Sequence, residues 1–127
     1  MKFISSKVHG ILDYVVAVAL FFAPIIFGFQ AVGGAAVIVP MVLGVILALY
    51  SLCTQYELGV LKLIDFQYHL AIDVVAAIFL AVSPFLFGFI DQAPNAWLPH
   101  ILVGVAIVLV VIFSRPVPEG QMRNVAM

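Results

Sequence analysis

Two histidine–aspartate pairs stand out in a sequence that has few ionisable groups. Residues 9–13 read HGILD and residues 69–73 read HLAID, so His9 precedes Asp13, and His69 precedes Asp73, by four positions. In a helix this spacing places both members of a pair on one face. An imidazole beside a carboxylate is suited to binding a metal ion, relaying a proton or forming a hydrogen bond between helices. Which of these three roles applies depends on the helices that carry the pairs and on how they are arranged.

The composition indicates that most of the surface faces lipid. Of the 127 residues, 66% are hydrophobic and 9% are charged, and the mean hydropathy is +1.31. A soluble domain normally carries roughly 25% charged residues. The net charge of −1 and the absence of a basic run argue against nucleic-acid binding. The single Cys53 excludes an internal disulfide and a multi-cysteine metal site.

Four segments are long and apolar enough to cross a membrane, for which about 20 residues are needed. They are residues 8–29, 33–54, 68–89 and 96–114. The first apolar run exceeds the 7–15 residues of a signal-peptide core, so we expect it to remain as a span. The middle segment is predicted to be either a short interfacial helix or a loop, and the residues after Arg115 a short mobile tail. The predicted fold is an all-α bundle of four transmembrane helices.

The basic residues predict the orientation of the bundle. They fall in the N-terminus, the middle loop and the C-terminal tail, and the other two loops contain none: Lys2, Lys7, Lys62, Arg115 and Arg123. The positive-inside rule therefore predicts that both termini are cytoplasmic in a plasma (inner) membrane. Four aromatic residues near span ends are expected at the headgroup level: Trp97, Tyr50, Tyr56 and Tyr68.

The chain matches itself, without a gap, when it is shifted by sixty positions. Each half contributes one His/Asp pair, one proline, two phenylalanines and two glycines to the match. His9, Asp13, Pro24, Phe27, Gly28, Phe29 and Gly44 match His69, Asp73, Pro84, Phe87, Gly88, Phe89 and Gly104. This repeat predicts two helical hairpins, residues 1–66 with the connecting loop and residues 67–127 with the tail. Because each hairpin has two spans, the repeats run parallel and are related by a pseudo-two-fold axis along the membrane normal.

The motifs APIIFGF (residues 23–29) and SPFLFGF (residues 83–89) carry a family resemblance. They resemble the Ser-Pro-Trp motif of the SPW-repeat family of small bacterial membrane proteins, in which such a hairpin occurs once or twice. Ile25 and Phe85 stand where tryptophan is usual, and Ala23 replaces the serine. The resemblance implies the two-hairpin architecture and no particular activity.

The repeated prolines and glycines have an expected structural role. A proline near the end of a span loosens the last helical turn, and a glycine after it ends the helix. Glycine inside a span lets helix backbones approach closely. We expect kinks or helix ends at Pro24, Gly28, Pro84 and Gly88, with a gating kink as the alternative, and close packing at Gly44 and Gly104.

Three interpretations of the His/Asp pairs remain open at the sequence level. All four groups are expected to face the bundle interior near the cytoplasmic side and to meet across the pseudo-two-fold axis. The first interpretation is a polar cluster that ties the hairpins together in a non-enzymatic membrane protein. The second makes His9 and His69 ligands of haem or a divalent metal, in a subunit of a redox or transport complex.

The third interpretation is a proton- or ion-conducting path. An apolar gap between Thr54 and His100 weighs against it, because a path needs polar steps along its length. No phosphate-binding loop, nucleophile elbow or HExxH motif is present, so we expect no enzyme activity. The expected partners are the lipid bilayer and either further copies of the chain or a larger membrane complex.

Overall fold

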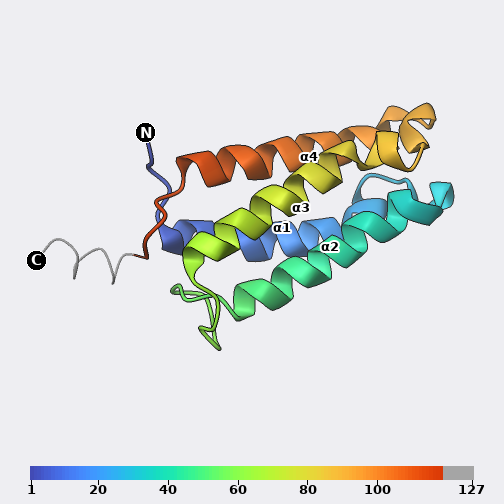
Figure 1. The fold of residues 1–127 in the computed structure, drawn as a ribbon. Helices are drawn as coiled ribbons and strands as arrows, with labels where there is room; N and C mark the ends of the chain where they lie inside the picture. Colours follow the sequence, from blue (N-terminus) through green and yellow to red (C-terminus); the bar gives the residue numbers. More distant parts are fainter. Residues whose placement is uncertain (119–127) are drawn as a thin grey trace, which may run out of the picture.

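The computed structural model describes residues 1–118, which form a bundle of four long helices (Figure 1). The helices are α1 (Ser6–Ile26), α2 (Gly34–Leu52), α3 (Phe66–Leu86) and α4 (Pro94–Phe113), with short 3₁₀ helices η1 (Gln30–Val32) and η2 (Phe89–Asp91) between the members of each pair. Each long helix has the length and hydropathy of a membrane span. No strand occurs within residues 1–118, and the prediction of an all-α, four-span bundle is confirmed. The expected tail, with Arg123, lies largely outside the described residues.

The helix bounds differ from the predicted spans by a few residues, for local reasons. Helix α1 begins at Ser6 rather than residue 8, because the Ser5 hydroxyl accepts a hydrogen bond from the Val8 N–H and caps the helix. It ends at Ile26 rather than residue 29, because Gly28 has a φ of +71° that a helix cannot continue through. Hydropathy detects the apolar run but not these caps. The middle segment is a loop, not an interfacial helix.

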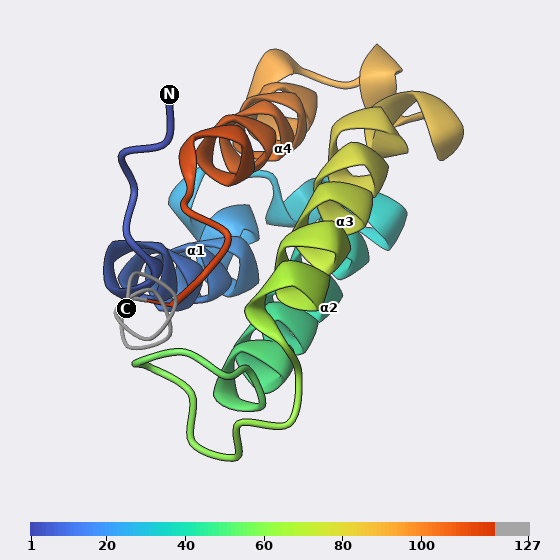
Figure 2. The ribbon, with the colours of Figure 1, turned by 60° about the vertical axis from the view of Figure 1, so that its left-hand side comes forward.

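The helices pack in two pairs, α1 with α2 and α3 with α4, and the pairs contact each other mainly where α3 runs beside α2 (Figure 2). The tight contact within each pair lies at the repeated glycines. A Cβ atom at Gly44 would lie 2.6 Å from the carbonyl oxygen of Ala17, and one at Gly104 would lie 2.6 Å from that of Ala77. Only glycine permits this approach of the two backbones.

The two ends of the bundle differ in what they contain. At the end opposite η1 and η2, the N-terminal segment, the middle loop and the residues after α4 come together (Figure 1); we call it the termini end. There Ile4 forms an isolated bridge with Ser114, and Ile64 forms one with Thr54, at positions related by the sixty-residue repeat. The start of each helix pair is thus attached to the end of the other pair.

At the opposite end, which we call the turn end, apolar side chains fill the space between the pairs. Phe29 and Phe89 are buried there and flank the ring of His100, with centroid separations of 5.5 and 4.7 Å. His100 Nε2 lies 3.0 Å from the carbonyl oxygen of Ala36. Pro40 lies inside α2, not in its first turn, and has no N–H to donate to that carbonyl. The histidine occupies the acceptor that the proline leaves free.

In the second proline motif, SPFLFGF, a side chain also satisfies a carbonyl oxygen that a proline leaves without a donor. Pro84 lies inside α3 and has no N–H for the carbonyl of Leu80, four residues earlier. The Ser83 hydroxyl donates a 2.7 Å hydrogen bond to that carbonyl oxygen. The serine of the motif therefore satisfies the acceptor that the adjacent proline exposes, and in α1 the equivalent position is Ala23.

Candidate functional site

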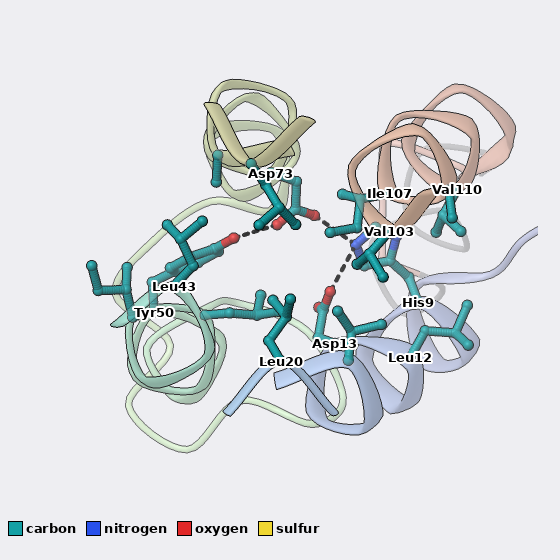
Figure 3. A pocket seen from close by; sticks show the side chains of 16 residues that line it. His9, Leu12, Asp13, Leu20, Leu43, Tyr50, Asp73, Val103, Ile107 and Val110 are labelled. Carbon is teal, nitrogen blue, oxygen red and sulfur yellow. Dashed lines mark hydrogen bonds and ion pairs between the residues drawn. The ribbon is translucent and has the colours of Figure 1, made fainter. Parts of the chain in front are cut away.

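The four residues of the two His/Asp pairs come together between α1 and α3, toward the termini end. All four are buried, with His9 and His69 at 1% and 0% exposure. One ligand atom from each of His9, Asp13, His69 and Asp73 lies within 4.8 Å of the others. We call this set the His/Asp cluster. Figure 3 shows three of its side chains, those of His9, Asp13 and Asp73, directed into the space between the helices.

The shorter contacts in the cluster join different helices. His9 Nε2 lies 2.9 Å from Asp73 Oδ2, and His69 Nε2 lies 2.9 Å from Asp13 Oδ2. The contacts within one helix, from each histidine to the aspartate four residues later, measure 3.2 and 3.3 Å. The cluster therefore links the two helix pairs, and it does so with near-equal geometry in both directions.

The other nitrogen of each imidazole meets a hydroxyl group from the opposite helix pair. His9 Nδ1 lies 2.8 Å from Ser114 Oγ, and His69 Nδ1 lies 2.7 Å from Thr54 Oγ1. Both hydroxyls already donate their hydrogen to a helix carbonyl, Ser114 to Val110 and Thr54 to Tyr50. A hydroxyl has one hydrogen, so each must accept from the imidazole. Nδ1 therefore carries a proton in both histidines.

With Nδ1 protonated, the state of Nε2 decides the chemistry of the cluster. A neutral imidazole then presents a lone pair at Nε2, directed toward the carboxylates, whereas an imidazolium presents a second N–H. His69 Nε2 has no hydrogen-bond partner within residues 1–118, although Asp13 and Asp73 oxygens lie 2.9 and 3.3 Å away. An N–H on this atom is aligned with neither oxygen. It is a fully buried polar atom aimed into a group of anionic ligands.

Each carboxylate also accepts a hydrogen bond from a tyrosine. Tyr50 of α2 donates to Asp73 Oδ1 at 2.5 Å, and Tyr56 of the middle loop donates to Asp13 Oδ2 at 2.7 Å. Tyr56 is 2% exposed and Tyr50 points into the bundle (Figure 3), so both hydroxyls serve the cluster, and the headgroup level of these rings stays a prediction. Burial, together with the Asp13 charge, raises the pKa of the Tyr56 phenol, which stays a donor.

The middle loop is held over the cluster by contacts with α1. The Ser6 hydroxyl lies 2.7 and 2.8 Å from the two carboxylate oxygens of Glu57. The Tyr14 hydroxyl donates to the carbonyl oxygen of Leu58 at 2.9 Å. A Cβ atom at Gly59 would lie 1.8 Å from the carbonyl oxygen of Thr54, so the loop turns there against its own backbone. These contacts fix the position from which Tyr56 reaches Asp13.

A cavity of about 270 Å³ lies beside the cluster, between all four helices (Figure 3). His9, Asp13, Asp73 and Tyr50 form its polar part. The rest of its wall is aliphatic, with Leu12, Val16, Leu20, Leu43, Ile46, Leu47, Ala76, Leu80, Val103, Ala106, Ile107 and Val110. The cavity is therefore an apolar chamber with one polar side.

Comparison with protein families identifies the chain. A model of the SPW repeat domain matches residues 7–114, which includes both His/Asp pairs, both proline motifs and all four helices. The chain belongs to the SPW repeat family. Neither the curated proteins nor the solved structures gave a significant match. With four helices of membrane-spanning length, this SPW repeat protein is a membrane protein, and lipid surrounds its helices.

The sequence predicted the two histidines and two aspartates of the cluster but not the residues that hydrogen-bond to them. Thr54 and Ser114 are sixty positions apart, as are the two histidines, so the repeat itself contained a signal for them. Tyr50 and Tyr56 carry no such signal, because the repeat places Val110 and Pro116 at the equivalent positions. The prolines and glycines named from the sequence lie near helix ends or at the contacts within each helix pair, as described above, and away from the cluster.

Proposed function

We propose that this protein is a non-enzymatic SPW repeat protein of the bacterial plasma membrane whose His/Asp cluster binds one divalent metal ion. The ion joins the two helix pairs through Nε2 of both histidines and one oxygen of each aspartate. Both termini face the cytoplasm, which places the cluster near the cytoplasmic side, and the protein acts as a homo-oligomer or as part of a larger membrane complex. The observation that supports the metal site is the fixed Nδ1–H of both imidazoles.

The hydrogen bonds around the histidines are those of metal ligands. An imidazole that binds a metal through one nitrogen generally donates its other N–H to an acceptor, which fixes the ring orientation. Ser114 and Thr54 supply this acceptor at 2.8 and 2.7 Å. The lone pairs of both Nε2 atoms then face the same two carboxylates, which repel them. A cation between these groups is coordinated by the nitrogen and oxygen atoms and removes the repulsion.

Charge balance favours a divalent ion. Two buried carboxylates with neutral histidines would leave two negative charges in a low-dielectric region. A charge costs about 2.5–3.5 kcal/mol at the centre of a membrane and less toward the surface where we place the cluster. One divalent ion neutralises both carboxylates. Imidazole nitrogen with carboxylate oxygen suits first-row ions such as Fe²⁺, Mn²⁺ and Zn²⁺.

The distances are close to those of a four-coordinate site. With ligand bonds of about 2.1 Å, neighbouring ligand atoms of a tetrahedral site lie about 3.4 Å apart. The four nitrogen–oxygen contacts in the cluster run from 2.9 to 3.3 Å, and those of Asp13 use both of its oxygens. All four ligand atoms lie within 4.8 Å of one another, so the side chains that are furthest apart must move closer together around an ion. Four protein ligands close the coordination shell, which is typical of structural rather than catalytic metal sites. A structural ion agrees with a protein that is not an enzyme.

The geometry favours an ion over haem and over ion conduction. A porphyrin held by two histidines must lie between their rings, and here the carboxylates of Asp13 and Asp73 occupy that space. A conducting path needs polar groups beyond the cluster. The cavity that continues from it has aliphatic walls instead.

The second candidate is a metal-free cluster of two imidazolium and two carboxylate groups. The 2.9 Å contacts between the helix pairs favour it, because they equal the length of charge-assisted hydrogen bonds. Such a cluster is also neutral overall and also joins the pairs. The poor alignment at His69 Nε2 is what it leaves unexplained.

Metal analysis of detergent-purified protein separates the two candidates. The protein is stripped with a chelator, reloaded with Zn²⁺ or Co²⁺, and followed by elemental analysis, the visible spectrum of Co²⁺ and thermal unfolding. We expect one ion per chain and a higher unfolding temperature on reloading, since an ion at 100 times its dissociation constant adds about 2.7 kcal/mol of stability. His69→Gln and Asp73→Asn should lose the ion. His100→Gln, a buried histidine at the turn end, is the matched control and should retain it.

Thr54→Ala and Ser114→Ala test the fixed tautomer directly. Loss of the group that orients a ligand typically weakens metal binding about 10–100-fold. A protein that takes up no metal, with an unfolding temperature unaffected by Zn²⁺, contradicts the metal proposal. If Asp73→Asn then still destabilises the protein, the imidazolium–carboxylate cluster is supported.

A further inference from the structure

The cavity beside the cluster has the size and polarity of a binding chamber for a small molecule. Its volume is about 270 Å³, and an apolar cavity of about 150 Å³ is large enough to hold benzene. All four helices contribute to its wall (Figure 3), and each polar lining residue either belongs to the His/Asp cluster or, as with Tyr50, hydrogen-bonds to it. A molecule that fills it must therefore have an apolar body and one polar group.

The cavity reaches the lipid-facing surface of the bundle. Ile46 of α2 and Ala106 of α4 both line it and are both exposed. These two residues are sixty positions apart, so the exposed lining positions are equivalent in the two helix pairs. A molecule that enters the cavity from this surface comes from the hydrocarbon region of the membrane, and is hence neutral.

The polar side of the cavity offers acceptors rather than donors. Tyr50, the hydroxyl donor on this side, already gives its hydrogen to Asp73. Asp13 has the most accessible side chain in the cluster, at 8%, and within residues 1–118 its Oδ1 has one polar contact, to His9 at 3.2 Å. A carboxylate oxygen has room for a second hydrogen bond. A hydroxyl group on the ligand satisfies that acceptor, whereas a carboxylate or phosphate group is repelled by it.

From this geometry we propose that the cavity binds a neutral, membrane-soluble molecule that carries a hydroxyl group on an apolar body, such as a phenol or an alkanol. The body fills the aliphatic chamber, and the hydroxyl donates to Asp13. The inference goes beyond the metal proposal and does not require the ion, because Asp13 keeps a free acceptor whether its other oxygen meets a metal or an imidazolium.

Binding is measured by equilibrium dialysis of the detergent-purified protein with 4-ethylphenol, 1-hexanol and ethylbenzene, corrected for partitioning into protein-free detergent. Ethylbenzene has the ring and the alkyl group but no hydroxyl. We expect saturable binding of 4-ethylphenol with an affinity at least tenfold higher than that of ethylbenzene, because a hydrogen bond to a charged acceptor is lost without the hydroxyl. The two hydroxyl compounds distinguish a ring-shaped from a chain-shaped body.

A matched pair of variants on α3 ties the binding to the cavity. Ala76 lines the cavity and Val75, its neighbour, is 70% exposed to lipid. Ala76→Phe should abolish saturable binding, and Val75→Phe should leave it unchanged, while metal content stays the same in both. Equal affinity for 4-ethylphenol and ethylbenzene, or equal binding by the two variants, overturns the proposal. Because metal content is read separately, this failure is distinct from failure of the metal site.

Discussion

The two helix pairs carry the same residues where they build the cluster and different residues where they surround it. His9 and His69 meet hydroxyls at equivalent positions, Ser114 and Thr54. The tyrosines break this symmetry: Tyr50 reaches Asp73 from α2, whereas Asp13 receives its hydrogen bond from the middle loop. At the position equivalent to Tyr50 stands Val110, which forms part of the cavity wall.

This difference distinguishes residues that join the two helix pairs from residues that surround the cluster. The repeated polar residues each have a partner in the other helix pair, so a change in one leaves a polar group there without its partner. The unrepeated residues fill space or satisfy a single acceptor. The symmetric polar residues therefore hold the pairs together and supply most of the polar lining of the cavity, whereas the unrepeated Tyr50 and Val110 make its wall unequal on the two sides.

The largest expected effect comes from removing either charge of the symmetric set. Asp13→Asn and Asp73→Asn each leave the two buried histidines with one anionic partner in place of two, and breaking a buried ion pair costs about 3–5 kcal/mol. Because the contacts are near-equal, we expect similar losses of unfolding free energy, measured by denaturant titration in detergent. Asp91→Asn, at an exposed position of η2, is the control. A loss confined to one of the two buried aspartates would contradict the equivalence.

A smaller effect is expected at the asymmetric tyrosines. Tyr50→Phe and Tyr56→Phe each remove a hydrogen bond to a carboxylate, for which about 1.5–3 kcal/mol is typical. The comparison with Tyr68→Phe, whose side chain is 68% exposed, isolates the contribution of the cluster. If Tyr56→Phe behaved like Tyr68→Phe, the middle loop would not be part of the site. Thermal unfolding of the three variants gives the ranking.

The repeated glycines should respond equally to a methyl group. Gly44→Ala and Gly104→Ala place a Cβ atom 2.6 Å from a backbone oxygen of the partner helix, so the helices must move apart. Overpacking of this kind costs about 1–3 kcal/mol. At Gly10 the nearest atoms belong to the Leu58 side chain rather than to a backbone, at 3.0 to 3.2 Å, so a smaller shift accommodates the methyl group. Gly10→Ala should therefore be milder, and an equal loss in all three would refute the role of backbone contact.

The smallest expected effect concerns the serine of the second motif. Ser83→Ala removes the hydrogen bond to the Leu80 carbonyl, and polar contacts between groups in membrane helices average about 0.6 kcal/mol. Ala23→Ser introduces the same hydroxyl beside Pro24 and should stabilise α1 by a similar amount. The double exchange should leave the unfolding temperature unchanged. A stabilising Ser83→Ala would show that the hydroxyl has another role.

Much of the fold followed from the sequence, because four apolar runs and a gapless repeat allow few arrangements. The four-residue spacing also predicts that each histidine shares a helix face with its aspartate. It does not predict that the contacts between pairs are the shorter ones, nor that Ser114, 105 residues from His9, accepts its Nδ1–H. The role of Tyr56 could not be predicted, because its position depends on a loop held by Glu57 and Leu58, and no sequence periodicity indicates the contacts of those residues.

The bridge between Ile4 and Ser114 has a consequence for the connectivity of the chain. It is the counterpart of the bridge between Ile64 and Thr54, where the backbone passes continuously from one helix pair to the next. The Phe3 and Ile4 N–H groups both donate to the Phe113 carbonyl, and the Arg115 N–H donates to Ile4. The backbone thus forms a ring in which one junction is covalent and the other is hydrogen-bonded. In a circular permutant, these two segments would be joined covalently and the middle loop would be opened, so the covalent and the hydrogen-bonded junction would change places. Two separate copies of a single helix pair would meet at two hydrogen-bonded junctions.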